Sequence, residues 1–419
     1  MGFNLPSADV EVLRELGRRK AEAAAHPDNI NHAELWTRTN DLQMTKPPIF
    51  IDEICWNEFM CDELALRSTH PFARKYEELL RRELYRWEHL RASMVVSPFM
   101  ECPMALHDSG FGIDEVVDTI TADESSDIVS RHFHVLIENM DDINKIQDPV
   151  IVHDEEETRR NHEMLLHIFD GILPVKIVGV KGYWFTPWDN LIRVTGIEEA
   201  MINLIEEPEF INALVERFVD ASIISMQRYN ELGAWSSNNS NMRVGSGGYG
   251  YCSALAPVDL DNMCNVPVQE LWGCGNAQIF SDVSPDMHWE FSLRHELRWI
   301  EQFGLSYYGC CEPLHHKLHI LDRIPNLRKV SMSPWAKLDE AREICKGRYV
   351  MSCKPSPAIF AGGALNETQA ANEIRAILEK TKGCSIEIVM KDVSTVGYQP
   401  QRLWQWARIA QDAVDRFYC

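Results

Sequence analysis

The chain has 419 residues, of which 45% are hydrophobic and 25% are charged, as in a globular protein that buries a sizeable core. Its formal net charge of −22 repels nucleic acid and anionic membranes, so neither is expected as a main binding partner. No run of about 18 apolar residues is present, and the N-terminal residues lack the basic and apolar regions of a secretory signal. We therefore expect a cytoplasmic protein without a membrane span.

The chain contains twelve cysteines. In a long chain without a secretory signal they are expected to be reduced thiols, most of them small buried residues, and not a disulfide framework. So many thiols also suit an organism that meets little oxygen and has an anaerobic metabolism.

Residues 1–92 are predicted to form a helical N-terminal extension. A cap at Ser7–Asp9 precedes apolar residues at helical spacing, and a second helical pattern begins at Pro71. Between these helices, Ile49–Glu53 predicts a short strand or an extended arm. Since no Gly/Ser-rich or Pro-rich linker follows, we expect this extension to pack on the main domain.

From residue 93 to residue 419, short apolar runs alternate with helical patterns. The predicted strands are Ser93–Ser97, Pro174–Val180, Asn241–Gly245, Ala277–Asp282, Gly304–Gly309, Leu327–Met332, Arg348–Cys353 and Ser385–Met390. The predicted helices are Glu209–Leu232, Met287–Gln302, Leu314–Ile324, Leu338–Lys346, Glu367–Lys382 and Arg402–Phe417. A helix follows each of the last four strands, which is typical of βαβ units and a parallel sheet. Eight strands in one closed layer predict an α/β protein with a (β/α)8 TIM barrel, and an open doubly wound sheet is the alternative.

The segment from Ser236 to Pro267 is the least regular part of this region, and Gly245–Tyr251 within it is rich in glycine. A phosphate-binding loop requires a helix immediately after the glycines, and none is predicted here. We interpret the segment as a flexible loop or one that covers the substrate.

Polar side chains follow several predicted strands. Asp282, Glu312, Lys354 and Asp392 lie at or just beyond four strand ends, and such ends converge on the mouth of a barrel. These four residues are therefore predicted to be catalytic. Two alternatives stay open, because Asp282 can also cap a helix, and Asp392 can form an exposed pair with Lys391 at a turn.

The segment Tyr307–His316 places two thiols and a carboxylate where a strand ends and a helix begins. Catalytic zinc takes three protein ligands from thiolates, imidazoles and carboxylates, so one cysteine of this pair is a predicted ligand, with the others to come from Cys353 and His315 or from Glu312 and His288. Since neighbouring strand residues point to opposite faces, only one of the two adjacent cysteines is expected to enter the mouth. The alternatives are a reduced thiol pair without metal and a surface position for His315.

Aromatic residues lie near other strand ends and in the glycine-rich loop. Trp184, Trp188, Tyr249 and Tyr251 are predicted to line an apolar substrate pocket. As an alternative, they are core or loop-anchoring residues.

The region from residue 93 to residue 419 resembles the uroporphyrinogen decarboxylase superfamily, including its corrinoid-dependent methyltransferase branch. The resemblance rests on Ala277–Met287, on the strand that ends in Gly309–Cys311, on Asn326–Ser331 and on Glu387–Met390. It implies a (β/α)8 barrel with its site at the C-terminal mouth.

The methyltransferase branch typically holds zinc through a His-x-Cys on this strand and a cysteine near the last strand. Cys311 matches the cysteine of that motif, which makes it the predicted ligand of the pair, whereas Gly309 occupies the histidine position and the late cysteine position lies near Asp392. The decarboxylase branch uses N-terminal arginines, and no matching arginine-rich segment is present.

The resemblance implies methyl transfer between a small methylated substrate and the corrinoid (cobalamin-type) group of a partner protein, with zinc as a Lewis acid. O-demethylation of an aromatic methyl ether would fit the aromatic loops, and a homodimer stays open. One alternative is a metal-independent decarboxylase or lyase that acts on a small carboxylated substrate through Asp282, Lys354 and Asp392. The other is a non-catalytic binding protein on the same fold.

Overall fold

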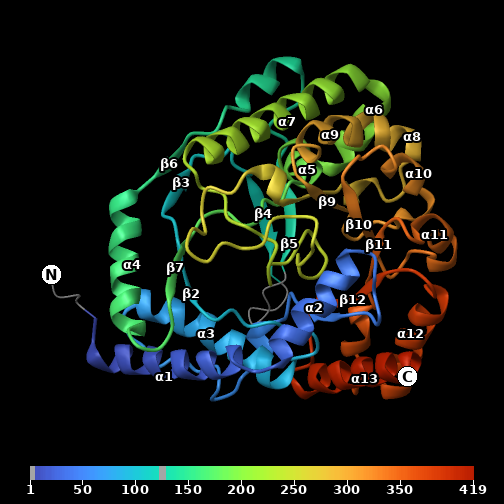
Figure 1. Ribbon diagram of the computed structural model, residues 1–419. Coiled ribbons are helices and arrows are strands. Elements are labelled where there is room, and N and C mark those ends of the chain that lie inside the picture. The colour runs from blue at the N-terminus through green and yellow to red at the C-terminus, as the bar shows by residue number, and fades with distance from the viewer. Residues whose placement is uncertain (1–4, 122–128) are drawn as a thin grey trace.

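A curled sheet of six parallel strands organises the protein (Figure 1). The computed structural model describes residues 5–121 and 129–419. In order across the sheet, the strands are β1 (Ile49–Ile51), β12 (Ile386–Met390), β11 (Val350–Cys353), β10 (Leu327–Met332), β9 (Leu305–Tyr308) and β8 (Trp272–Gly275). The α/β class is therefore confirmed, with the sheet forming a half-barrel.

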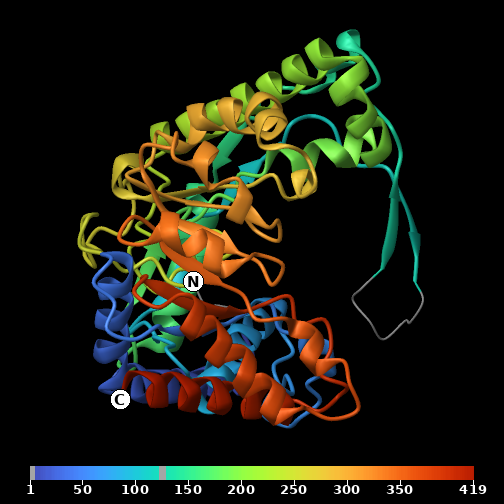
Figure 2. The same cartoon turned by 90° about the vertical axis from the view of Figure 1, so that its right-hand side faces the viewer.

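The remaining strands form three separate pairs in the described ranges. The parallel pair is β2 (Met100–Pro103) with β7 (Val175–Val178). The antiparallel pairs are β3 (Leu106–Asp108) with β6 (Ile151–His153), and β4 (Val117–Ile120) with β5 (Ser130–Phe133). Figure 2 shows the last pair standing away from the body. The closed eight-stranded barrel of the prediction is not confirmed, because the six strands of the sheet do not pair with β2 or β7.

Five of the eight predicted strands are present as β7, β9, β10, β11 and β12. The prediction of a strand at Ser93–Ser97 is wrong, because several of its backbone groups form hydrogen bonds with side chains and not with a neighbouring strand. The indole of Trp36 donates to Ser93 O, and the Asn241 amide donates to Val95 O. The Asn29 side chain accepts from Val96 N.

The other two strand predictions are also wrong. Asn241–Gly245 turns back on itself at Gly245, which has a φ of 55°. Ala277–Asp282 lies beyond β8, which ends at Gly275, and contains the 3-10 helix Gln278–Phe280.

Thirteen α-helices lie within the described ranges. They are α1 (Ser7–Ala24), α2 (Asp28–Asn40), α3 (Pro71–His89), α4 (Glu155–Phe169), α5 (Pro187–Thr195), α6 (Ile197–Glu206), α7 (Pro208–Glu231), α8 (Pro285–His288), α9 (Arg294–Ile300), α10 (Leu318–Leu321), α11 (Leu338–Cys345), α12 (Glu367–Lys380) and α13 (Gln401–Tyr418). A π-helical turn, Trp289–Leu293, joins α8 to α9. Within the described ranges, no helix has the length and apolarity needed to cross a membrane.

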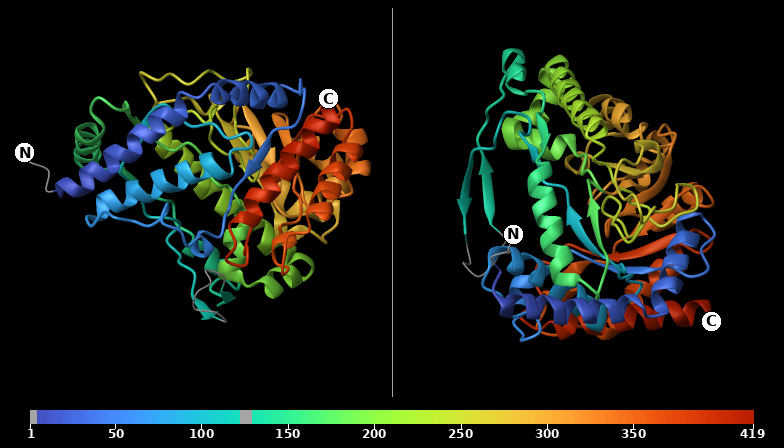
Figure 3. Two further views of the ribbon diagram at one scale, coloured as in Figure 1. Left: turned by 90° about the horizontal axis from the view of Figure 1, so that it is seen from below. Right: turned by 60° about the vertical axis from the view of Figure 1, so that its left-hand side comes forward.

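The N-terminal helices are joined to the sheet through β1. Helix α3 begins with Pro71 at its first position, and the His70 side chain accepts from Phe72 N. Its buried residues, including Ala73, Leu80 and Leu84, recur at helical spacing and pack against α1. Seen from below, α1, α3 and α13 lie on the same side of the molecule (Figure 3). The division at residue 92 stays a prediction, although β1 from this segment pairs with β12.

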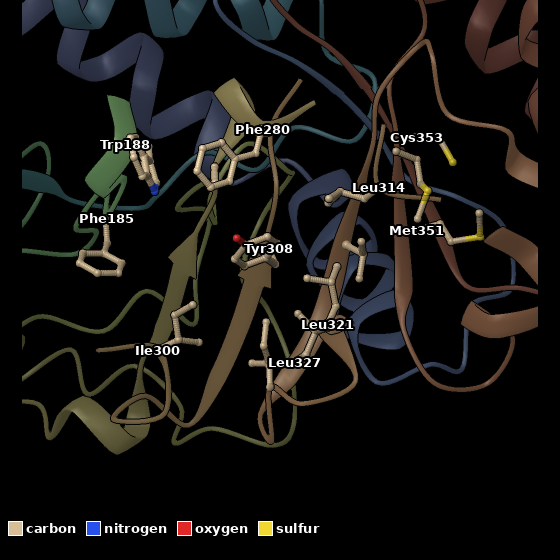
Figure 4. Close-up of a cluster of buried hydrophobic side chains, with 14 of the residues drawn as sticks. Phe185, Trp188, Phe280, Ile300, Tyr308, Leu314, Leu321, Leu327, Met351 and Cys353 are labelled. Atoms are coloured by element: carbon tan, nitrogen blue, oxygen red, sulfur yellow. The ribbon is translucent and has the colours of Figure 1, made fainter. Parts of the chain in front are cut away.

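The two faces of the sheet differ in chemistry because successive strand residues alternate. Ile49, Ile51, Tyr308, Val330 and Met332 belong to the large apolar core between the sheet and its helices, part of which Figure 4 shows. The alternate residues Phe50, Tyr307, Lys329, Ser331 and Glu387 face the concave side. That side therefore carries the polar groups.

The glycine-rich segment fills the concave side. Gly248 N donates to Glu387 Oε1 at 2.9 Å, and Ser246 Oγ donates to Gly309 O at 3.1 Å. A Cβ on Gly248 would lie 2.1 Å from the Trp36 ring, so only glycine fits. Most of residues 244–250 are buried against the sheet, which disagrees with the interpretation of this segment as a flexible loop. That the segment covers a substrate stays a prediction.

Candidate active site

The cysteine pair directly follows β9, at the carboxyl edge of the sheet. Gly309 has a φ of 101°, which favours glycine, and the chain then reaches Cys310 and Cys311. A Cβ on Gly309 would lie 2.4 Å from Leu314 Cδ1 and 2.9 Å from Ser331 Cβ. A larger residue at this position would therefore require its neighbours to shift.

The two thiols lie together beside a lysine. Their sulfur atoms are 3.6 Å apart, and Lys391 Nζ, just beyond β12, lies 3.6 Å from Cys310 Sγ. Hydrogen bonding from Cys311 lowers the pKa of Cys310 to about 7, against the effect of burial and with help from the charges of Lys391 and Lys354. The same hydrogen bond, together with burial and the charge of Cys310, raises the pKa of Cys311. Cys310 is therefore the more acidic thiol of the pair, and Cys311 is the exposed one.

Two carboxyl groups complete this cluster. Glu53, two residues beyond β1, lies 3.3 Å from Lys391 Nζ through Oε2 and accepts from Arg243 at 2.6 Å through Oε1. Asp392 Oδ2 lies 3.3 Å from Lys391 Nζ and 3.8 Å from Cys311 Sγ. Glu53 and Asp392 have φ values of 50° and 56°, a strained conformation of the kind that clusters at functional sites.

The environment separates the acidities of these carboxyl groups. Burial raises the pKa of Glu53, but the hydrogen bond from Asp392 and the charges of Lys391 and Arg243 outweigh it and lower the pKa to about 2. Burial and the hydrogen bond with Glu53 raise the pKa of Asp392. Pairs of titratable groups with separated pKa values are the usual sign of an acid and its charged partner. Here Asp392 is the weaker acid of the two.

Lys354 lies behind the thiols on the concave side. Its Nζ donates to Tyr307 OH at 3.0 Å, to Cys310 O at 3.2 Å and to Ser331 Oγ. Ser331 Oγ also donates to Cys310 O at 2.5 Å. Lys354 is buried, so it fixes the backbone of Cys310 and adds positive charge near the Cys310 thiol.

Glu312 is fully buried and holds the turn from inside. Its Oε2 accepts from Cys310 N at 2.8 Å. Burial raises the pKa of Glu312, although backbone donors and the charge of Lys354 oppose the shift. This contact makes Glu312 a positioning group for the cysteine pair.

Asp282 is exposed and lies in the loop after the 3-10 helix Gln278–Phe280. The helix cap that was its alternative role belongs to Ser284, whose side chain accepts from Met287 N. Burial lowers the pKa of Lys317 to about 8, against the charges of Glu312 and Asp282. A catalytic role for Asp282 stays a prediction.

The three predicted metal ligands do not come together. Cys353 points to the outer face of β11, where it packs with Met351 in the apolar core (Figure 4). His315 Nε2 lies 3.9 Å from Glu340 Oε2. Among the described residues, the groups of three or more possible ligands with all ligand atoms within 4.8 Å of one another are Glu63, Glu88 and His89, and His107, Asp154 and Glu157. The predicted zinc ligand set therefore does not fit this arrangement, and the Lys391 ammonium already lies against the Cys310 thiol.

The four aromatic residues predicted to line a substrate pocket do not lie in one place. Trp188 is fully buried in the core, where its indole donates to Phe291 O at 3.0 Å, in agreement with the alternative interpretation (Figure 4). Trp184 is exposed. Tyr249 packs against Phe50 with ring centroids 4.9 Å apart and lines a cavity of about 520 Å³, with the half-buried Tyr251 at its side.

Several site residues were not among the predicted ones, namely Cys310, Lys391, Glu53 and Arg243. The sequence contains a signal for Glu53, because Ile49–Ile51 is an apolar run that ends in two acids, as other predicted strands end in polar groups. Arg243 has no such signal, because it reaches the site from an irregular segment.

Of the comparisons with known proteins, the one with solved structures bears on the fold. No family model and no curated protein sequence matches the chain. A solved structure described as a methyltransferase from Methanosarcina mazei matches with a TM-score of 0.51 and 11% sequence identity. The match covers 92% of this chain and 98% of that structure. At this identity, the likeness establishes a similar fold over nearly the whole of both chains.

Proposed function

We propose that the protein is a methyltransferase that moves a methyl group from a small methylated substrate, such as an aromatic methyl ether, to the corrinoid of a partner protein. The observation that carries the proposal is the cluster of Asp392, Glu53, Lys391 and the cysteine pair at the carboxyl edge of the sheet. The likeness in fold to a methyltransferase supports it.

The proposed reaction needs a proton donor at the leaving oxygen. When the methyl–oxygen bond breaks, the bonding electrons remain on that oxygen, and a nearby acid stabilises it by giving a proton. Asp392 has the required properties, because its carboxyl group is exposed at the edge and its pKa is raised. Glu53 stays ionised between Arg243 and Lys391, and its hydrogen bond with Asp392 helps to raise the pKa of Asp392.

A bound corrinoid would supply the nucleophile that accepts the methyl group. The exposed Cys311 thiol lies next to Asp392, so it would contact a substrate whose leaving oxygen lies at Asp392. Zinc assistance stays a prediction, and no step above uses it.

The test measures methyl transfer from a panel of aromatic methyl ethers to reduced cobalamin, followed by the absorption spectrum and mass of methylcobalamin. Asp392→Asn is the informative variant, because asparagine tolerates a positive φ but cannot give up a proton in this way. We expect its turnover to fall by about 100-fold, within the range typical of a general acid. Asp286→Asn, at an exposed acid on α8, is the control and should retain activity.

Two results would contradict the proposal. One is full methyl transfer by Asp392→Asn. The other is release of carbon dioxide from carboxylated substrates without methyl transfer, which would instead establish the lyase alternative.

A further inference from the structure

A cavity lies between β1 and β2, at one side of the half-barrel. Its walls come from β1, from α3, from residues 94–101 and from residues 241–243. It lies where the predicted strand Ser93–Ser97 is absent. At about 520 Å³ it has the size of a small-molecule site.

The charges that line this cavity oppose the charge of the chain. Overall the protein has 41 basic and 63 acidic residues. Three acidic residues line the cavity, Asp52, Glu83 and Glu101, against five basic ones, Lys20, Arg82, Arg86, Lys181 and Arg243. A pocket of one dominant sign concentrates ligands of the opposite sign.

Four of the five basic groups already have a close acidic partner. Lys20 lies 2.6 Å from Glu83, and Arg82 lies 2.6 Å from Glu78. Arg243 lies 2.9 Å from Asp52, and Lys181 forms a close ion pair with Glu101.

Arg86 is the exception. Its Nη1 lies 3.8 Å from Asp52 Oδ1, while its Nη2 donates to the backbone of Ile51 at 2.6 Å and its guanidinium lies over the Phe50 ring. Asp52 is also held by Arg243, so Arg86 is the least neutralised cation of the cavity. A guanidinium of this kind suits a carboxylate.

The rest of the lining is apolar and aromatic. Phe50, Trp56, Tyr76, Phe99 and Tyr249 contribute rings to it. Such walls favour a ligand with an apolar or aromatic body.

We propose that this cavity binds a small organic anion with an aromatic body, and that Arg86 receives its carboxylate. The cavity is joined to the cysteine pair through Glu53, which contacts Arg243 of the cavity with one oxygen and Lys391 with the other. The identification of this anion as the methylated substrate rests on the proposed function. The binding of the anion does not.

The experiment titrates the full chain with 4-methoxybenzoate and with its neutral isostere 4-methoxybenzamide, by calorimetry and tryptophan fluorescence. We expect saturable binding of the acid, and binding of the amide at least tenfold weaker. Arg86→Gln should weaken binding of the acid at least tenfold. Arg74→Gln, at an exposed arginine of α3 that is not part of the cavity lining, should change it less than threefold.

Arg86→Lys keeps the charge and should restore part of the affinity, which separates loss of the anion site from misfolding. Equal binding of acid and amide, full affinity in Arg86→Gln, or absence of saturable binding of the acid would each overturn the proposal. If anion binding is as expected but no methyl group is transferred, the proposed function fails and the anion site stands. If methyl transfer proceeds unchanged in Arg86→Gln, the cavity is not the substrate site.

Discussion

The two faces of the curled sheet treat buried ionisable groups in opposite ways. On the concave face, Lys329 and Glu387 are both fully buried and form an ion pair of 2.8 Å. On the outer face, burial raises the pKa of Glu296 to about 8 and lowers that of His288 to about 3, so both are uncharged near neutral pH. Burial is costly for a lone charge, and a protein avoids that cost either by pairing the charge or by removing it.

Adjacent residues of β9 show the contrast at one point. Tyr307 faces the concave side, where its hydroxyl accepts from the Lys354 ammonium at 3.0 Å. Tyr308 faces the helices and is bonded to neutral His288 at 2.9 Å. The face that keeps its charges is the one whose edge carries Cys310 and Lys391, which is where ionic chemistry is possible.

The largest effect is expected from breaking the concave ion pair with Lys329→Met. This substitution leaves the Glu387 carboxylate buried with Gly248 N as its remaining close donor. Removing one partner of a buried pair typically costs about 3–5 kcal/mol in the free energy of unfolding. Chemical denaturation of the variant and the wild type measures the loss.

The double variant Lys329→Met/Glu387→Gln is the control for this prediction. Glutamine removes the lone charge while its carbonyl oxygen still accepts from Gly248 N. We expect the double variant to recover more than half of the lost stability. If the free energy of unfolding of Lys329→Met lies within about 1 kcal/mol of the wild-type value, the ion pair with Glu387 does not stabilise the fold as proposed.

A smaller effect is expected on the outer face from Glu296→Gln. Because the folded-state pKa of Glu296 is raised to about 8 from a usual value of 4.5, folding retains a proton that the unfolded chain loses. Its contribution to stability is complete below pH 4.5 and is lost as the pH rises to 8. Glutamine does not titrate, so this part of the pH dependence should disappear, and the variant should gain about 3–4 kcal/mol relative to the wild type between pH 5 and pH 8.

Unfolding free energies of both proteins at pH 5 and pH 8 test this prediction. Glu301→Gln, at an exposed glutamate just after α9, should show no such pH-dependent difference. If Glu296→Gln is destabilised equally at both pH values, Glu296 is not protonated in the folded protein.

Four strands of the sheet that could be predicted from the sequence, β9 to β12, are buried on both faces. Such strands appear as continuous apolar runs, as in Leu327–Met332, and each predicted bound there agrees closely with the structure. The run Met94–Val96 has the same appearance, but its backbone groups bond to the side chains of Asn29 and Asn241. Those partners lie 67 and 146 residues away, so no local pattern reveals them.

The candidate site was predictable to the same degree. The position of the cysteine pair follows from the end of β9, whereas Glu53 reaches Lys391 only because β1 pairs with β12. The assignment of Cys353 as a ligand conflicts with the two-residue period of a strand, because Lys354 and Ser352 alternate with it. Since Lys354 points to the concave side, Cys353 had to point away, and this could have been argued from the sequence.

The smallest expected effect concerns the charged edge itself and comes from Lys391→Met. The Lys391 charge helps to keep the pKa of Cys310 near 7, after the larger effect of the Cys311 hydrogen bond. Loss of that charge should raise the pKa of Cys310 by about one unit, equivalent to about 1.4 kcal/mol. The pH dependence of the thiolate ultraviolet absorbance, taken as the difference from the same protein carrying Cys310→Ser, measures this pKa.

Lys337→Met removes an exposed lysine outside the cluster and should leave the titration unchanged. An unchanged titration in Lys391→Met would mean that the hydrogen bond from Cys311, and not the charge of Lys391, determines the pKa of Cys310. The pairing of charges seen on the concave face would then not include the cysteine pair.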